Sequence, residues 1–161
     1  MFLNKKKFIL LISASSLAFL LIFNQVNSQE LRVVDGDTIH LNGEKIRFTG
    51  IDTPELKQTC IKEEVIDPCG MTAKEILIKK ISNNKVLCIS EGKDQYNRTL
   101  AECFVNDESL SSYLVRSGYA FAYRKYSKKF VPDEDYAKLN KIGMWSMKFS
   151  YPWEYRKSNK N

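Results

Sequence analysis

Residues 31–49, LRVVDGDTIHLNGEKIRFT, contain the clearest structural signal in the chain. Their pattern is that of a strand, a turn and a second strand, and Asn42-Gly43 is typical of a two-residue turn between antiparallel strands. Such a turn fixes the register of the two strands, and here it places Thr38 opposite Arg47. The sequence therefore predicts a hairpin that brings polar side chains together at one end.

Acidic side chains stand on both sides of this hairpin. Asp35 and Asp37 precede its turn, and Asp52 and Glu55 follow it around Thr53-Pro54. Acids beside glycine or proline often only cap the backbone of a turn, which is one interpretation of each residue taken alone. The other is a metal site, because oxygen ligands without histidine or thiolate select a hard cation such as Ca²⁺. Asp37 and Asp52 are the predicted ligands.

The chain has a single histidine, His40, which leaves little material for a multi-histidine zinc site or a histidine acid–base relay. We interpret it as a strand surface residue. A phosphodiester suits the remaining groups, because it carries one negative charge and gains a second when water attacks. Arg47 and Arg98 are predicted to hold it, since a guanidinium donates two hydrogen bonds and stays protonated. Either arginine alone would be interpreted as a solvated surface group.

The rest of the chain predicts further strands and helices, with no internal repeat and no interdomain linker. Residues 85–90 and 99–104 are predicted strands, joined by the polar loop 91–98. The tail after Trp153 is polar and is expected to be loose. The predicted helices are residues 72–82 with a Thr72–Glu75 capping box, residues 108–117 with Asp107 as N-cap and Gly118 as terminator, and the stretch from Pro132 to about Gly143.

A length of 161 residues favours one domain with a genuine core. Lys5-Lys6-Lys7 followed by the apolar stretch 8–23 resembles a secretory signal, with a cut expected after Ser28. The apolar stretch is short for a spanning helix, which needs about 20 residues, but an uncleaved anchor remains the alternative. Removing residues 1–28 would lower the net charge from +6 to +3, because they contain three lysines and no acid. Export to the cell surface, the periplasm or the medium is therefore expected.

Four cysteines remain after that cut, and an even number in an exported chain predicts two disulfides among three possible pairings. Their spacing favours Cys60 with Cys69, and Cys88 with Cys103 across adjacent strands. Four buried thiols would be the alternative in a cytoplasmic protein.

Separated motifs of this chain resemble the staphylococcal nuclease (thermonuclease) family, in the family's order and at compatible spacing from about Leu31 to Ser150. Asp-Gly-Asp-Thr alone would be a weak signal, whereas the whole set is specific. The motifs are Val-Asp-Gly-Asp-Thr at 34–38, Arg47, Asp-Thr-Pro-Glu at 52–55, Asp-Gln-Tyr-Asn-Arg at 94–98 and Gly-Met-Trp-Ser at 143–146.

The resemblance implies an α+β, mainly β fold: an OB-fold five-stranded barrel with three helices, over residues 29–150, followed by a polar tail, 151–161. It also implies one Ca²⁺ ion and hydrolysis of DNA and RNA, single-stranded or frayed, leaving 3′-phosphates. A monomer without an obligate protein partner is expected, and contact with a membrane only if residues 1–28 stay attached.

The resemblance also assigns roles to residues, position by position. Asp37, Asp52 and the backbone carbonyl of Thr53 match the calcium ligands, and Asp35 occupies a supporting acidic position. Arg47, Glu55 and Arg98 match the catalytic residues, with Glu55 deprotonating or orienting the attacking water. Tyr96 and Tyr123 match residues that flank the nucleotide. Asn97 replaces the family's usual glycine, and the insertion 59–70 resembles a cysteine-containing subgroup whose disulfide would brace the loop after Glu55.

Two other interpretations remain. A noncatalytic OB module would bind nucleic acid or protein without cleaving it, and a membrane-tethered adaptor would keep residues 1–28; the latter leaves the acids and arginines unexplained. The basic and aromatic stretch 123–129 fits a nucleic-acid contact and a solvated loop equally well. Trp145 and Trp153 are interpreted as packing residues rather than base-stacking platforms.

Overall fold

The computed structural model of the chain describes residues 29–160. The predicted signal peptide or anchor, residues 1–28, lies outside these residues. In the described part, no helix combines the length and the apolar character needed to cross a bilayer.

A curled sheet with the strand path β1-β2-β3-β8-β7 forms one layer of the molecule, which confirms the α+β fold with a five-stranded OB-type sheet. Neighbouring strands run antiparallel except β3 and β8, which are parallel. A short sixth strand, β9, extends β8 at its end. The bounds are β1 Leu31–Val33, β2 Thr38–Leu41, β3 Glu44–Phe48, β7 Leu87–Lys93, β8 Thr99–Val105 and β9 Glu108–Ser109.

The hairpin register predicted from Asn42-Gly43 is confirmed. Thr38 lies opposite Arg47 along β2 and β3. Asn42 and Gly43 have φ angles of 51° and 81°, the positive values that a two-residue turn of this hand requires. The cross-strand pair Cys88–Cys103 on β7 and β8 is also confirmed as a disulfide.

Gln29, just before β1, is linked to Val86, the residue directly before β7, so the starts of the two outer strands are joined. Its side-chain amide donates a hydrogen bond to the carbonyl of Val86 at 2.7 Å and accepts one from the Val86 amide at 2.8 Å. These are the two bonds that a neighbouring strand would make, and a glutamine can make both because its amide holds a donor and an acceptor. We call this pair the Gln29 clasp.

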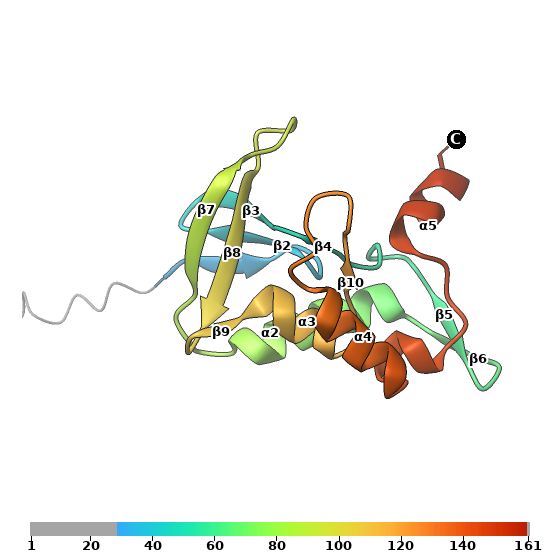
Figure 1. Cartoon of the computed structure of the whole chain (residues 1–161). Coiled ribbons are helices and arrows are strands. Elements are labelled where there is room, and N and C mark those ends of the chain that lie inside the picture. The colour runs from blue at the N-terminus through green and yellow to red at the C-terminus, as the bar shows by residue number, and fades with distance from the viewer. Residues whose placement is uncertain (1–28, 161) are drawn as a thin grey trace, which may run out of the picture.

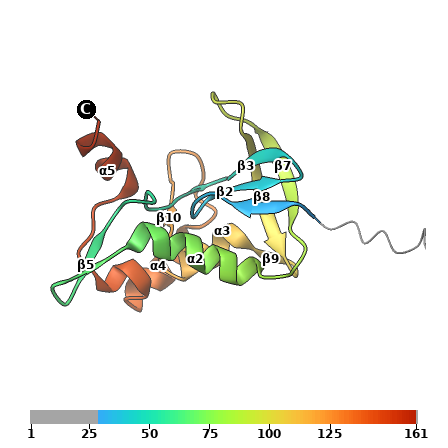
Figure 2. The ribbon, with the colours of Figure 1, turned by 180° about the vertical axis from the view of Figure 1, so that it is seen from behind.

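Helices cover one side of the curled sheet, as the two opposite views show (Figures 1 and 2). Buried apolar side chains such as Ile39, Phe48, Leu77 and Leu114 fill one continuous core that includes residues of the sheet and of the helices. The helical elements are α2 Cys69–Ile81, α3 Leu110–Arg116, α4 Val131–Leu139, the 3-10 turn η1 Gly143–Ser146, and α5 Pro152–Ser158.

The first two helices begin at other residues than predicted. Thr72 does not cap α2, because the helix begins at Cys69 directly after Pro68, and the Thr72 hydroxyl instead donates to the Pro68 carbonyl. Asp107 does not cap α3: Asn106 and Asp107 have φ angles of 50° and 63° and form a turn between β8 and β9. Ser109 is the N-cap and accepts from the Ser112 amide.

The C-terminal part also differs from its prediction. The third predicted helix, α4, ends at Leu139, before Gly143. The tail expected to be loose contains α5, which begins with Pro152 as a helix-starting residue and ends with Arg156 and Lys157 in its last turn. Gly118, with a φ of 76°, follows α3 as the predicted terminator.

Two small sheets complete the fold beside α5. β4 (Ile51–Asp52) pairs with β10 (Phe121–Ala122), and β5 (Cys60–Lys62) pairs with β6 (Val65–Asp67). A second apolar cluster lies at this end, with Phe121 in contact with Trp145 and Trp153 among other aromatic rings. Both tryptophans therefore pack as predicted.

Candidate active site

Asp37 is held in the turn between β1 and β2 with its side chain turned inward. The Asp35 carboxylate accepts the Asp37 amide at 3.1 Å and so caps this turn, while the Asp37 carbonyl accepts the Phe48 amide at 2.8 Å. The Asp37 side chain is 1 % exposed. Burial raises the pKa of its carboxyl to about 6, although the Arg47 guanidinium beside it acts to lower that pKa.

Asp52 lies on β4, where it pairs in register with Phe121 of β10, and its side chain is as deeply buried as that of Asp37. Thr53, the next residue, connects the two acids: its amide and its hydroxyl donate to the Asp37 carboxylate at 3.0 and 2.8 Å. Sequence-distant residues of the β1–β2 turn and of β4 are thus fastened together.

Arg47 bridges the two buried acids. Its guanidinium donates to Asp37 through one terminal nitrogen and to Asp52 through the other, at 2.8 Å. Burial lowers the pKa of Arg47, but Asp37 and Asp52 more than reverse this and hold the pKa above its ordinary value. Arg47 therefore balances a pair of carboxylates that would be costly to bury without a cation.

Glu55 stands at the edge of this cluster with 42 % of its side chain exposed. The loop that follows it is tightly held: the Gln58 amide donates to the Glu55 carbonyl at 2.7 Å, and Gln58 accepts the Gly70 amide at 3.1 Å. The disulfide Cys60–Cys69 joins the loop to the start of α2, as the spacing predicted. A Cβ on Gly70 would stand 1.8 Å from the Glu55 carbonyl oxygen, so only glycine fits there.

Arg156 of α5 is a member of this cluster that sequence reasoning missed. It donates to both oxygens of Asp52, at 3.2 and 2.7 Å, and to Glu55 at 2.8 Å. Burial lowers the pKa of Arg156, but the hydrogen bonds to Asp52 and Glu55 raise it well above its ordinary value. Pro152 and Glu154 are typical of a helix start and were the available signal, but nothing in the tail indicates which residue its arginine meets.

Arg98 is the last residue of the loop between β7 and β8, directly before β8. Its guanidinium pairs with Asp94 at 2.6 Å. The parallel register sets Leu100 beside Arg47; since strand side chains alternate, Arg98 shares the sheet face of Leu100 and therefore of Arg47. Tyr96, at the tip, is 71 % exposed, and Asn97 has a φ of 59°.

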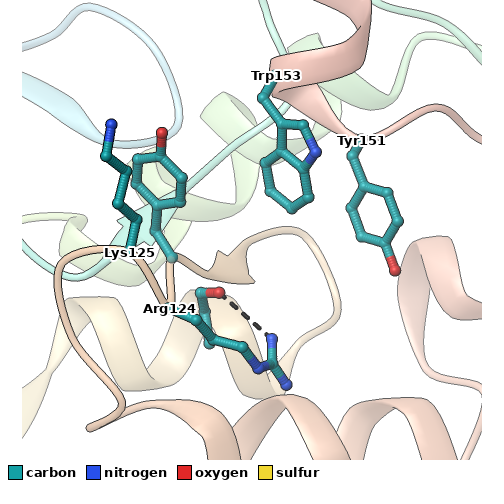
Figure 3. Close-up of a pocket in the computed structure, with 6 residues that line it drawn as sticks. Arg124, Lys125, Tyr151 and Trp153 are labelled. Atoms are coloured by element: carbon teal, nitrogen blue, oxygen red, sulfur yellow. Dashed lines mark hydrogen bonds between the residues drawn. The ribbon is translucent and has the colours of Figure 1, made fainter.

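A shallow aromatic and basic pocket of about 350 Å³ lies beside β10, lined by Ala122, Tyr123, Arg124, Lys125, Tyr151 and Trp153. Figure 3 shows Trp153 and Tyr151 on one side and Arg124 and Lys125 on the other. The ring of Trp153 is nearly parallel to those of Tyr151 and Tyr123, with centroids 4.5 and 6.0 Å away. The Tyr123 amide donates to the Gly50 carbonyl at 2.9 Å, which places this pocket next to β4.

The fold and the cluster together define a small OB-type domain with an acid and arginine centre at one end of its sheet. Residues 45–147 match the family model described as staphylococcal nuclease homologue. The chain therefore belongs to the staphylococcal nuclease family, as its motifs indicated.

Its relatives have different names. The chain is 26% identical to the protein ParB of Escherichia coli, over 99% of this chain and 97% of that protein. It is 32% identical to the succinoglycan biosynthesis protein ExoI of Rhizobium meliloti, over 70% and 61% respectively. It is 36% identical to the thermonuclease of Staphylococcus intermedius, over 65% and 60%. The chain thus spans nearly all of the first relative and about three fifths of the other two.

Proposed function

We propose that this protein is a nuclease that hydrolyses phosphodiester bonds of DNA and RNA with the help of Ca²⁺, leaving 3′-phosphate ends. The observation that carries the proposal is the convergence of Asp37, Arg47, Asp52 and Glu55 in one cluster, in a chain of the staphylococcal nuclease family. The name of the Staphylococcus intermedius relative, thermonuclease, supports it.

The donor set fits a hard cation. Asp37 and Asp52 present two buried carboxylates, whose negative charge Arg47 balances when no cation is bound. In residues 29–160 no group of three or more acidic, histidine or cysteine side chains is arranged to hold a metal, so backbone oxygen and water would supply the other ligands, which Ca²⁺ accepts. Thr53 is the proposed source of a carbonyl ligand and Asp35 supports the charge from the adjoining turn. When bound, the cation would neutralise charge that develops on the phosphoryl oxygens.

The arginines are proposed to bind the phosphate. Arg47 and Arg98 share one face of the sheet, and a guanidinium on each side of a phosphodiester can donate to its non-bridging oxygens. Both arginines face carboxylates in this structure. A bound phosphate would therefore share these donors or draw them away from Asp37 and Asp94.

Glu55 is the proposed general base, or the residue that orients the attacking water. Its partial exposure lets water reach the carboxylate, and the fixed loop behind it keeps it in place. The water oxygen would bond to phosphorus as its proton passes to Glu55. The bond from phosphorus to the 5′-oxygen would break, and that oxygen would take up a proton.

Tyr123 and Tyr96 are proposed to contact the nucleotide. Tyr123 lines the aromatic pocket next to β4, where a base could stack. Tyr96 is exposed at the hairpin tip beside Arg98. Single-stranded or frayed substrates suit this arrangement, because bases in an intact duplex are not free to stack on a side chain.

Action outside the cytoplasm, as a monomer, completes the proposal. The two disulfides suit an oxidising compartment, since such bonds persist mainly in exported proteins.

Cleavage of labelled single-stranded DNA and of RNA by the purified protein, with Ca²⁺, Mg²⁺ or chelator, tests the proposal. We expect degradation with Ca²⁺, none with chelator, and 3′-phosphate ends. Glu55→Gln should lower kcat by at least about a hundredfold and keep substrate affinity. Asp107→Asn, which changes an acid in the β8–β9 turn, is the matched control and should cleave normally.

A noncatalytic binding module is the competing function, favoured by the relatives whose names do not mention a nuclease. Substrate binding without cleavage under every metal condition would establish that module and refute the enzyme. Cleavage that persists in chelator would refute the role of the cation. If Glu55→Gln cleaves as fast as the parent, the proposed base is wrong.

A further inference from the structure

Helix α5 lies outside residues 45–147, the part of the chain that matches the family model, yet it covers the acidic cluster. One hydrogen bond of the helix and two contacts of the segment directly before it keep it there. The Tyr155 hydroxyl donates to the Lys57 carbonyl at 3.3 Å, Gln58 donates to the Ser150 carbonyl at 2.7 Å, and Ile61 forms a backbone bridge with Lys148. The helix is therefore fastened to the loop that carries Glu55.

Arg156 uses this placement to occupy the carboxylates that the proposed function needs. Asp52 offers two oxygens, and Arg156 donates to both, while Arg47 shares one of them. The Asp52 side chain is 1 % exposed and Arg156 is 38 % exposed, so the pair closes the outer side of Asp52. The same guanidinium also holds Glu55.

A divalent cation and Arg156 cannot both keep close contact with Asp52. The cation needs an oxygen of Asp52 at 2.3–2.6 Å, the distance usual for Ca²⁺. That would put two further positive charges beside a guanidinium in a partly buried place, where like charges repel strongly. Either Arg156 withdraws or the cation binds weakly.

We propose that Arg156 and α5 form a latch that competes with the divalent cation for Asp52 and occupies one carboxylate oxygen of Glu55. Cation binding displaces Arg156 and loosens α5. The inference rests on the proposed function, because it assumes that Asp52 is a cation ligand. In the latched state the arginine stabilises the buried acid without metal.

Only molecules with an open latch bind the cation, so the apparent Kd equals the intrinsic Kd divided by the fraction of open molecules. An arginine that donates to both oxygens of a buried carboxylate forms a strong ion pair. Arg156 is partly exposed, however, and solvent reduces the free energy that this ion pair contributes to the latched state. We therefore expect removal of the guanidinium to tighten Ca²⁺ binding about tenfold.

Titration calorimetry with CaCl₂ alone, without nucleic acid, tests this on the purified protein and its Arg156→Gln variant. Lys157→Gln is the matched control, because it removes the same charge from the next residue of α5. We expect a Kd about tenfold lower for Arg156→Gln and a change of less than about twofold for Lys157→Gln. Tyr155→Phe loosens the helix without changing charge and should also tighten binding. Circular dichroism checks that each variant folds.

Hydrogen exchange measures whether α5 itself loosens. Electrostatic repulsion between Arg156 and the cation, without movement of the helix, would not change this exchange. In the parent, saturating Ca²⁺ should speed amide exchange in residues 153–158 of α5 several-fold and leave exchange in α2 unchanged. If exchange in α5 stays the same or slows, Arg156 keeps its position beside the cation and the latch is wrong.

The outcomes separate the latch from the nuclease. Equal Kd values for the parent and Arg156→Gln, in a parent that cleaves DNA with Ca²⁺, would refute the latch and leave the proposed function intact. If Lys157→Gln lowers the Kd for Ca²⁺ as much as Arg156→Gln does, the latch is likewise refuted, and the change in net charge explains the effect. If the parent and all variants bind no Ca²⁺, both the latch and the role of the cation fail.

Discussion

Arg47 is the residue on which the buried charge of the cluster depends most. It contacts both Asp37 and Asp52, whose side chains are almost fully buried. Without Arg47, the buried Asp37 would lose the cation that it contacts and would favour its protonated form, while Asp52 would keep its contact with Arg156.

Arg47→Ala should therefore destabilise the fold by about 3 kcal/mol in chelator, as measured by urea unfolding. Added Ca²⁺ should restore part of the loss, since a ligand that binds only the folded state stabilises it. Arg32→Ala, at an exposed position of β1, should change stability by less than about 0.5 kcal/mol. Equal effects of the two substitutions would contradict this account of Arg47.

Gly70 gives a second test, one of backbone packing. A Cβ at this position meets the carbonyl of Glu55 at 1.8 Å and cannot be accommodated without moving the loop. Gly70→Ala should destabilise the protein by about 1–3 kcal/mol and lower kcat, because Glu55 moves with its backbone. Gly92→Ala, where a Cβ meets no neighbour but φ is 132°, controls for backbone strain alone and should leave kcat unchanged. Urea unfolding and cleavage rates should be measured for both variants; an unchanged kcat in Gly70→Ala would contradict the prediction.

The residues of the cluster were predictable from sequence to different degrees. Asp37, Arg47, Asp52 and Glu55 could be found because a tight turn and short loops fix their relative positions. Arg156 could not, since it reaches Asp52 only through the docking of a separate helix, which no local pattern encodes.

At the scale of elements, the register of the β2–β3 hairpin followed from the sequence more reliably than the helix ends did. The short strands β4, β5, β6, β9 and β10 were not predicted, and β7 extends to Lys93, into the predicted loop. Asn106-Asp107 could serve either as an N-cap or as a turn, and both uses satisfy the same local preferences. Pairing of β9 with β8 decided in favour of the turn. Helix α2 likewise begins at Cys69, directly after Pro68 and before Thr72, because the loop carrying Gln58 holds Gly70 in place.

The two disulfides should have separable effects. They close segments of similar size, with sequence separations of 9 and 15 residues, so each removal should cost about 2–3 kcal/mol. Cys60→Ser with Cys69→Ser should also lower the cleavage rate of fully folded protein, since this bridge braces the loop after Glu55.

Cys88→Ser with Cys103→Ser is the matched control and should reduce stability alone, because its bridge lies between β7 and β8. Cleavage rates measured at a temperature where circular dichroism shows both variants to be folded would separate the two effects. Equal loss of activity in both would argue against the bracing role.

At the scale of the whole molecule, the distribution of positive charge bears on nucleic-acid binding. The chain has a net charge of +6, but the stretch 123–129 is partly neutralised. Arg124 pairs with Glu134 and Lys129 pairs with Glu102. Lys125, in contrast, lines the aromatic pocket.

Binding of single-stranded DNA should accordingly weaken as salt rises, and Lys125→Gln should reduce the slope of log K against log salt by about 0.7. Fluorescence anisotropy in a Glu55→Gln background measures this without cleavage. Lys79→Gln on α2 is the control of equal charge change and should leave the slope unaltered. A slope independent of Lys125 would favour a solvated loop at 123–129.

The Gln29 clasp has a mechanical consequence. Residue 29 is the point at which any load carried by the preceding segment enters the domain, and only two side-chain hydrogen bonds fasten it to Val86. A pull on that end would break the clasp first and then peel β1 from β2 one bond pair at a time, as a zipper opens. The domain should therefore yield to low force in this direction, and the peeling would run toward the turn after β1 that holds Asp37.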